Sequence, residues 1–258
     1  MGNFELLKWD SGFFGFNIAK INDTCLSPGI FGNLYQELKN NKVKLIYWPS
    51  DLNCRTQNEI SKEFNGNLVD VKTQFEKDLR KTDRIIFEKQ TSIEFYKNKK
   101  PADRMLEIAI QCGEFSRFKV DPDFPSGKFE ELYKTWLIKS LTGELADEVI
   151  ITKKHELVTG LITVGSKDGK GNIGLVGVHG DSRGIGQGSI LIKAALNYFV
   201  ENKCYVASVV TQGLNQAACR LYEKFGFRVS EKANFYHLNS SSSILSHLCF
   251  NLSVLHLL

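Results

Sequence analysis

The chain has 258 residues, of which 42% are hydrophobic and 24% charged, and its formal net charge is +4. These values are ordinary for a soluble globular protein that folds as one large domain or two small ones. They exclude the strong basic excess of a nucleic-acid-binding domain and the long apolar run of a stable membrane span, while a mild positive balance suits anionic ligands.

The first hundred residues carry short signals of both strands and helices. Strands are predicted at residues 44–48, 68–75 and 84–87, the first ended by Pro49, and a helix is predicted at residues 53–64. The aromatic segment 9–16 is consistent with a strand and turn that fill a core, and the lysine-rich segment 97–101 with an exposed joint. We therefore expect a small N-terminal α/β part at residues 1–100.

The following segment shows helical periodicity and then the pattern of a β-hairpin. Apolar residues recur at helical spacing in two stripes, Met105, Leu106, Ala109 and Ile110, then Phe129, Leu132, Tyr133, Trp136, Leu137 and Leu141. Strands are predicted at residues 148–152, 157–164 and 173–178, the last two joined by a turn at 167–171. We expect these elements to belong to a second domain at residues 101–238.

A glycine-rich turn follows the strand at residues 173–178. It reads Ser-Arg-Gly-Ile-Gly-Gln-Gly-Ser at residues 182–189, and an amphipathic helix begins directly after it. Backbone N–H groups and the positive end of a helix dipole converge at such a turn, and glycines leave room for a large anion. The sequence therefore predicts a phosphate or pyrophosphate site.

Two kinds of enzyme use a turn of this sort. Short-chain dehydrogenases require a long βαβ array downstream, but only about half a domain follows here, without a Tyr-x-x-x-Lys pair. Read as Arg183-x-x-Gly186-x-Gly188, the turn resembles the acetyl-CoA pyrophosphate loop of the GNAT acetyltransferases. Residues 215–227, Asn-Gln-Ala-Ala-Cys-Arg-Leu-Tyr-Glu-Lys-Phe-Gly-Phe, follow a predicted strand and resemble the second motif of the same family.

The resemblance implies a fold, a co-substrate and a set of binding residues. The fold class is α/β (α+β), with a mixed, mostly antiparallel central sheet flanked by helices, and the co-substrate is acetyl-CoA, without a metal. Its contacts are expected at Val176, Val178, Arg183, Gly184, Ile185, Gly186, Gln187, Gly188, Ser189 and Asn215. The Arg183 side chain would add a charge-assisted contact. Asn215 is also a natural N-cap, so capping and CoA contact both stay open.

The resemblance also implies direct attack of an amine on the thioester carbonyl. Gly177, in an otherwise β-branched strand, predicts a bulge that frees the N–H of Val178 for the carbonyl oxygen; a packing glycine is the alternative. Tyr222 is the expected general acid for the thiolate, with a core aromatic as the alternative. It follows Asn215 by two helical turns and shares its face. His179 and Glu114 are candidates for the base, and the sequence assigns neither.

Two further segments resemble the TDP-fucosamine acetyltransferase branch of this family, residues 7–15 and residues 113–118. That branch acetylates the 4-amino group of a TDP-linked 4-amino-4,6-dideoxyhexose for bacterial surface polysaccharides. The likeness implies substrate contacts by Glu114, Ser116 and Arg117, with the arginine on the diphosphate or in a structural salt bridge. A GNAT enzyme that acts on another amine (a peptide N-terminus or a small molecule) and a non-catalytic CoA-binding module remain open.

The cysteines and the two ends of the chain bear on location. Six cysteines without Cys-x-x-Cys or metal-ligand spacing predict reduced thiols and a cytoplasmic protein. The N-terminus lacks the basic and apolar regions of a signal peptide. Residues 239–258, polar and then rich in Leu and His, are expected to be an atypical tail outside the core. A homodimer is compatible with these features.

Overall fold

The computed structural model describes residues 3–81, 83–84 and 93–240, and chain contacts divide the protein into two compact units. Unit 1 comprises residues 1–69 and 234–258, and unit 2 comprises residues 70–233. Strands β4 (Asn67–Asp78) and β10 (Arg228–Asn239) contain residues of both units. The division differs from the expected boundary at residue 100, because most of β4 pairs with β9 (Val206–Gln212) of unit 2.

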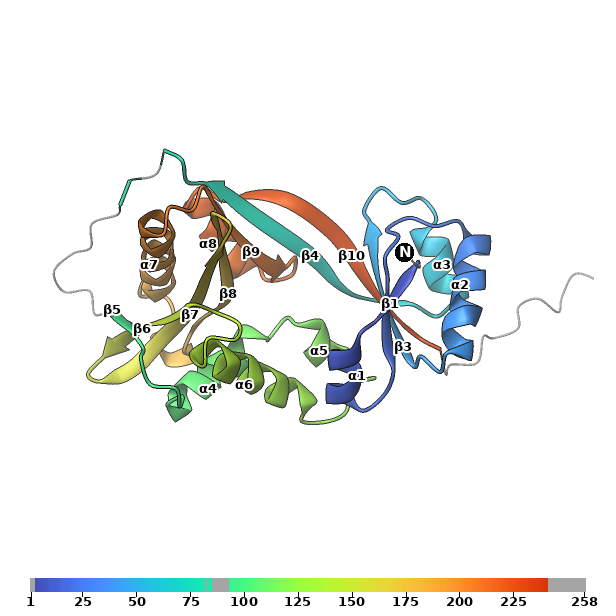
Figure 1. Ribbon diagram of the computed structural model, residues 1–258, viewed down its shortest axis with the longest axis horizontal. Helices are drawn as coiled ribbons and strands as arrows, with labels where there is room; N and C mark the ends of the chain where they lie inside the picture. The colour runs from blue at the N-terminus through green and yellow to red at the C-terminus, as the bar shows by residue number, and fades with distance from the viewer. Residues whose placement is uncertain (1–2, 82, 85–92, 241–258) are drawn as a thin grey trace, which may run out of the picture. The chain divides into compact units, whose positions relative to one another are not determined.

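Unit 1 is a small sheet with helices packed on it (Figure 1). Its strands lie in the order β1-β2-β3-β10, and β2 (Ile18–Ile21) is antiparallel to β1 (Phe4–Leu6) and parallel to β3 (Leu45–Asp51). The helices are α1 (Lys8–Phe14), α2 (Pro28–Asn40) and α3 (Gln57–Glu63). The core is aromatic: the Phe31 ring centroid lies 4.9 Å from that of Trp48 and 5.1 Å from that of Phe64.

Several expectations for the N-terminal part are wrong in detail. Most of the segment 9–16 forms helix α1 and not a strand and turn. Strand β3 continues through Pro49, because the resolved pairing of β3 with β2 ends at Tyr47 and the proline interrupts no bond of that ladder. Helix α3 begins at Gln57, later than predicted. The strand expected at 84–87 lies, apart from Arg84, outside the described residues.

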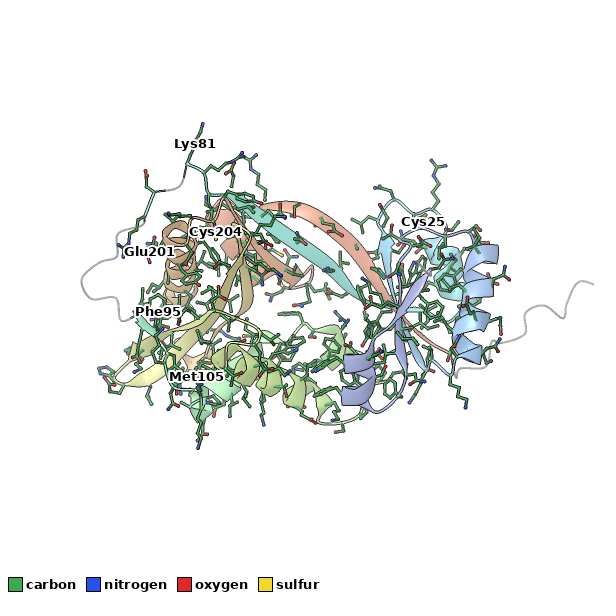
Figure 2. All side chains as sticks on the ribbon, viewed as in Figure 1. Cys25, Lys81, Phe95, Met105, Glu201 and Cys204 are labelled. Atoms are coloured by element: carbon green, nitrogen blue, oxygen red, sulfur yellow. A yellow bond between two sulfur atoms is a disulfide. The ribbon has the colours of Figure 1, made fainter. Side chains whose placement is uncertain are left out.

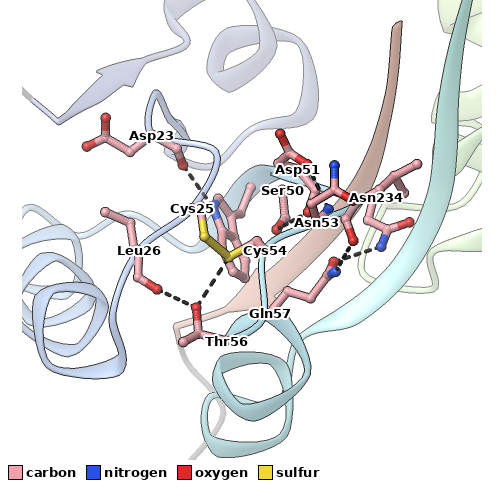
Figure 3. The surroundings of a disulfide bond; sticks show 12 residues. Asp23, Cys25, Leu26, Ser50, Asp51, Asn53, Cys54, Thr56, Gln57 and Asn234 are labelled. Atoms are coloured by element: carbon pink, nitrogen blue, oxygen red, sulfur yellow. Dashed lines mark hydrogen bonds between the residues drawn. A yellow bond between two sulfur atoms is a disulfide. The ribbon is translucent and has the colours of Figure 1, made fainter.

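A disulfide bond between Cys25 and Cys54 joins the loops that follow β2 and β3 (Figure 3). Because these strands are neighbours and parallel, their carboxyl ends bring the two loops to one edge of the sheet. The expectation of reduced cysteines is therefore wrong for this pair, whose separation of 29 residues carries no local signal. Free thiols are Cys112, Cys204 (Figure 2) and Cys219, while Cys249 lies outside the described residues. Cytoplasmic location loses this support and stays a prediction.

Unit 2 is a mixed sheet with helices on both faces. Its strands lie in the order β10-β4-β9-β8-β7-β6-β5, with β5 (Ile93–Phe95), β6 (Glu148–Lys154), β7 (Leu157–Lys167) and β8 (Lys170–Val178). Strands β8 and β9 are parallel, and the other pairs of resolved register in this unit are antiparallel. A mixed, mostly antiparallel sheet flanked by helices confirms the predicted fold class.

The helices of unit 2 cover opposite faces of strands β6 to β8 (Figure 1). One face carries α7 (Gln187–Glu201), with α8 (Gln216–Lys224) next to it; the other carries α4 (Asp103–Cys112) and α6 (Lys128–Leu141), with the short α5 (Arg117–Val120) between them in the chain. The predicted helices at 105–110 and 129–141 are confirmed. The hairpin is also confirmed, with a turn at Asp168-Gly169 whose positive φ values, 52° and 74°, suit a type I′ turn. No helix in the described ranges is long and apolar enough to cross a bilayer.

Candidate active site

The parallel strands β8 and β9 separate part-way along their length. They pair from Lys170 with Val206 to Ile173 with Val209, but β8 then continues to Val178 alongside β7, and β9 continues to Gln212 alongside β4. The carboxyl end of β8 therefore has an edge that faces away from β7 and is not paired with β9. Unpaired backbone groups of this kind bind ligands or water.

The bulge expected at Gly177 lies a few residues earlier. Ile162 of β7 pairs with Val176 of β8, but Val164 pairs with Ile173, so β8 has one extra residue between these two pairs. Gly177 itself pairs regularly with Leu161. A Cβ atom at position 177 would lie 2.5 Å from the Cys112 Sγ atom. Gly177 is thus a packing glycine that lets α4 approach the sheet, and the bulge interpretation of this residue is wrong. The bulge begins where β8 leaves β9.

Backbone alternation identifies the N–H groups that point into the gap between β8 and β9. The N–H of His179 donates to the Thr159 carbonyl of β7 over 2.9 Å. Successive residues of a strand direct their N–H groups to opposite sides, so those of Val178 and Val176 point away from β7. The Val176 N–H donates to the thiol of Cys112. Val178, the residue expected to hold the carbonyl oxygen, therefore directs its N–H into the gap.

The glycine turn opens onto the start of α7. Gly184 and Gly186 have positive φ values of 80° and 86°, and no described atom lies within 4 Å of the position where either would carry a Cβ. Helix α7 has 15 residues and begins at Gln187, directly after Gly186. Glycine at these positions avoids backbone strain and leaves the space above the helix N-terminus open. The predicted anion cradle therefore has the required geometry, whereas Gly188 packs α7 against Leu221 of α8.

The cation at this cradle differs from the one that the sequence suggested. The Arg183 guanidinium points toward α4. It donates to the Val178 carbonyl of β8 and to the Gln111 Oε1 atom of α4, each over 3.1 Å. Lys224 of α8 instead places its Nζ atom 3.4 Å from the Ser189 hydroxyl, in the first turn of α7. An ammonium group beside a helix N-terminus strengthens an anion site. Lys224 belongs to the second motif, at residues 215–227, but the sequence does not show that its side chain lies beside the N-terminus of α7.

Helix α8 carries Asn215 and Tyr222 as predicted. Asn215 caps the helix, because its side chain accepts a hydrogen bond of 3.1 Å from the Ala218 N–H. Tyr222 is 2% exposed and packs on Phe75 and Phe227. Burial raises its pKa well above 10, and the neighbouring Cys112 and Cys219 raise it further. The hydroxyl therefore stays protonated at any physiological pH, as a general acid for a thiolate must.

His179 is held by charged neighbours. Its Nδ1 atom lies 2.7 Å from Asp181 and its Nε2 atom 3.1 Å from Glu107. Arg104 donates to Asp181 and to the Val158 carbonyl, the latter over 2.7 Å. Both ring nitrogens are engaged in this network, which anchors the segment before the glycine turn. The structural interpretation of His179 therefore fits better than a role as base.

The three residues expected on the substrate side surround the short helix α5. Glu114 accepts a hydrogen bond of 2.6 Å from Lys119 and is exposed. Ser116 is buried, caps α5 through the Phe118 N–H, and hydrogen-bonds to Tyr133. Arg117 stacks its guanidinium 4.3 Å from the centre of the Phe118 ring. The structure thus brings Ser116 and Arg117 together on the α4–α6 side, whereas Glu114 points to solvent with Lys119.

The gap, the glycine turn and Tyr222 lie in a segment that matches a known protein family. Residues 105–227, which hold the gap, the glycine turn and Tyr222, match the model of the acetyltransferase (GNAT) family. This segment is a GNAT acetyltransferase domain. No curated protein matches the chain. A GNAT domain uses acetyl-CoA as acyl donor, and the open glycine cradle, the α7 N-terminus and Lys224 fit its pyrophosphate.

Solved GNAT structures share the fold at low identity. A GCN5-related N-acetyltransferase from Sphaerobacter thermophilus has 12% identity and a TM-score of 0.61, over 92% of this chain and 76% of that one. A tandem GNAT protein from the clavulanic acid biosynthesis pathway has 11% identity and a TM-score of 0.56, over 88% and 76%. A protein from Kribbella flavida has 13% identity and a TM-score of 0.53, over 89% and 83%. Likeness at this level of identity shows a common fold alone.

Two groups near the gap, Cys112 and Asp70, were not singled out by the sequence pattern. Cys112 was one of six cysteines without a motif, yet its thiol lies against Gly177 and the Val176 N–H, and burial raises its pKa to about 12. Asp70 precedes the matched segment and carries no motif at all. Within residues 3–81, 83–84 and 93–240, no group of three His, Cys, Asp or Glu side chains could hold a metal ion.

Proposed function

We propose that this GNAT enzyme transfers the acetyl group of acetyl-CoA to a primary amine by direct attack of the nitrogen on the thioester carbonyl. The observation that carries the proposal is the gap between β8 and β9, which begins at the β8 bulge and contains the edge of β8 at Val176 and Val178 that β9 leaves unpaired. The pantetheine arm of CoA completes the hydrogen bonding of that edge. The pyrophosphate binds the N–H groups of the glycine turn and Lys224.

In this proposal, the residues around the gap stabilise the negative charge on the carbonyl oxygen and protonate the leaving thiolate. Negative charge develops on the carbonyl oxygen as the amine attacks, and the Val178 N–H is fixed where it can donate to that oxygen. The carbon–sulfur bond then breaks, and Tyr222 gives its hydroxyl proton to the leaving thiolate. Cys112, whose pKa of about 12 keeps it a thiol, is a poor nucleophile, which favours direct transfer over an acyl-cysteine intermediate.

For the acceptor, we propose the 4-amino group of a TDP-linked 4-amino-4,6-dideoxyhexose used in surface polysaccharide synthesis. Support comes from the resemblance of residues 7–15 and 113–118 to the enzymes that use this substrate. Arg117 on the α4–α6 side offers a planar cation for a diphosphate, and the buried Ser116 and Tyr133 offer hydroxyl groups.

Steady-state turnover with acetyl-CoA tests this function. The acceptors are the TDP-linked amino sugar, the free amino sugar, spermidine, kanamycin and a short peptide with a free N-terminus. We expect the nucleotide sugar to have the highest kcat/KM and the free sugar to lose turnover as well as affinity, because binding energy from the nucleotide is lost. Equal kcat/KM for free and TDP-linked sugar would reject the nucleotide-sugar assignment. Turnover of another amine instead would leave the acetyltransferase and replace its substrate.

A further inference from the structure

Asp70 lies at the same end of the sheet as the gap. Strand β4 pairs with β9 from Lys72 opposite Gln212, and the Gly213 N–H donates to the Val71 carbonyl over 2.8 Å. Asp70 therefore lies just beyond the carboxyl end of β9. Because β8 and β9 are parallel, the carboxyl end of β8, with Val176 and Val178, is at that same end.

The side chain of Asp70 is on the opposite face of the sheet from Tyr222. Side chains alternate between faces along a strand, so Asp70 shares a face with Lys72, and Phe75 points to the other. The Phe75 ring lies 5.6 Å from the Tyr222 ring of α8, which identifies its face as the one covered by α8. Asp70 interacts instead with Arg117 of α5. Asp70 and Tyr222 thus place one ionisable group on each face of the sheet.

One carboxylate oxygen of the buried Asp70 has no hydrogen-bond partner among the described residues. The residue is 8% exposed, and no described residue hydrogen-bonds to its Oδ1 atom. Burial raises its pKa from the ordinary 3.8 to about 6, although Arg117, the Val71 N–H and Lys72 act in the opposite direction. Buried polar atoms are usually paired, so Oδ1 is available to a ligand.

Electrostatic neighbours connect Asp70 to the reaction centre. The hydroxyl of Tyr133, on α6, hydrogen-bonds to Ser116 and is within electrostatic range of Asp70, Arg117 and Cys112. The Cys112 thiol, on α4, accepts the Val176 N–H and contributes to the raised pKa of Tyr222. The groups that face Asp70 are therefore Arg117 from α5, Tyr133 from α6 and Lys72 on its own strand. Through Tyr133 and Cys112 this cluster extends to the gap.

We propose that Asp70 is the general base of the reaction: its carboxylate binds the acceptor as an ammonium ion and removes one proton. This inference rests on the proposed N-acetyl transfer. The neutral amine then forms the nitrogen–carbon bond as the carbon–sulfur bond breaks, and Tyr222 protonates the thiolate. The second proton of the attacking nitrogen leaves through water and restores Tyr222, and Asp70 releases its proton to solvent. Base and acid thus act from opposite faces of the sheet, on the two sides of the thioester carbon.

The test compares Asp70→Asn with Asp78→Asn, a control on the same strand whose carboxylate is exposed and paired with Arg80. The acceptor is whichever amine of the panel above the wild type acetylates fastest. We expect Asp70→Asn to lower kcat/KM at pH 7 by roughly 10²- to 10⁴-fold, as loss of a positioned base does. Affinity for acetyl-CoA, measured by calorimetry, stays unchanged. Asp78→Asn behaves as the wild type in both measurements.

The pH profile separates a base from a merely structural residue. Wild-type kcat/KM should fall as the pH drops through about 6, because protonated Asp70 cannot accept the amine proton. In Asp70→Asn this limb should vanish, and activity should instead rise with pH toward the pKa of the free amine. A variant that keeps wild-type kcat/KM or retains the limb near pH 6 would overturn the assignment.

A binding experiment distinguishes failure of the base from failure of the substrate proposal. With CoA present, the wild type should bind the TDP-amino sugar more tightly than the TDP-linked 6-deoxyhexose of the same configuration, which differs only by a hydroxyl in place of the amine, and Asp70→Asn should remove that difference. If neither nucleotide binds but another amine is acetylated, the nucleotide-sugar assignment fails and the kinetic test of Asp70 proceeds with that amine. If the wild type binds acetyl-CoA but acetylates no amine, both proposals fall.

Discussion

Units 1 and 2 both pack helices on a sheet, but they differ in the side chains that they bury. Unit 1 fills its core with aromatic rings around Trp48 and is crosslinked by the Cys25–Cys54 disulfide. Unit 2 separates two strands of its sheet and buries ionisable groups beside the gap. Among the described residues, the largest upward pKa shifts lie in unit 2, at Asp70, Cys112, Tyr133, Tyr198 and Tyr222, whereas in unit 1 burial raises the pKa of Tyr35 and Tyr236 by less.

The difference shows where the molecule gives up stability for chemistry. Strongly perturbed pKa values cluster at functional sites, because catalytic acids and bases need pKa values that match their task. Four of the five groups, Tyr198 excepted, lie around the gap between β8 and β9. We therefore expect substitutions at the gap in unit 2 to separate activity from stability, and substitutions in the aromatic core or the disulfide of unit 1 to affect stability alone.

The largest effect is expected for Tyr222→Phe in unit 2. The variant removes the proton donor but keeps the ring that packs on Phe75 and Phe227, so kcat should fall by roughly 10²- to 10⁴-fold while the affinity for acetyl-CoA stays within about twofold. Stopped-time assays of free thiol release, combined with calorimetry, make the comparison. Near wild-type turnover would mean that the thiolate leaves without this acid.

In unit 1, the disulfide should contribute only to stability. Removing a crosslink that closes a loop of 29 residues costs roughly 3–4 kcal/mol by the chain-entropy relation, so Cys25→Ser should lower the free energy of unfolding by that amount. Urea denaturation checks it, with Cys219→Ser, which removes a free thiol, as the control. Identical urea midpoints for Cys25→Ser and the wild type would contradict the crosslink. We expect kcat to stay unchanged in both variants.

A smaller effect of opposite sign is expected at Asp70. Its folded pKa of about 6 exceeds the ordinary 3.8, so the folded state binds more protons between these values and stability decreases as the pH rises through them. Asp70→Asn removes that penalty and should stabilise the protein at pH 7 by at most about 3 kcal/mol. The gain should disappear below pH 4, where wild-type Asp70 is protonated in both states. Denaturation at pH 3.5 and pH 7 tests this, and a variant that is destabilised at pH 7 would show that the carboxylate is a structural ion.

The sequence predicts those parts of unit 2 that depend on local chemistry. Asn215 could be recognised as an N-cap, the Asp168-Gly169 turn follows from the turn residues, and the glycines at 184 and 186 occupy backbone with positive φ that disfavours other residues. The order of strand, turn and helix was enough to predict an anion site. Each of these features lies within a few residues of its own signal.

Features that depend on distant packing were not predictable in this way. Gly177 was expected to mark a bulge, but the neighbour that requires a glycine there is Cys112, on a helix that precedes it by more than fifty residues. Arg183 was assigned to the ligand because a sequence does not show that Gln111 and the Val178 carbonyl bind its guanidinium. Asp70 and the disulfide have no motif, because strand pairing alone determines which groups they meet.

We expect the glycine turn before α7 to bind the pyrophosphate of acetyl-CoA, and Gly127 provides a matched control for Gly186 in that turn. Gly127 and Gly186 are both N-cap residues of long helices with similar positive φ, 79° and 86°, and neither has a described atom within 4 Å of its Cβ position. Valine at either position should cost similar backbone strain, of the order of 1–2 kcal/mol.

The decisive measurement is calorimetric titration of acetyl-CoA into Gly186→Val and Gly127→Val. We expect Gly186→Val to abolish detectable binding, because its side chain projects into the space above the α7 N-terminus, and Gly127→Val to bind as the wild type. Thermal melts of both variants confirm that they are folded. Wild-type affinity in folded Gly186→Val, or equal losses in the two variants, would contradict pyrophosphate binding at this turn.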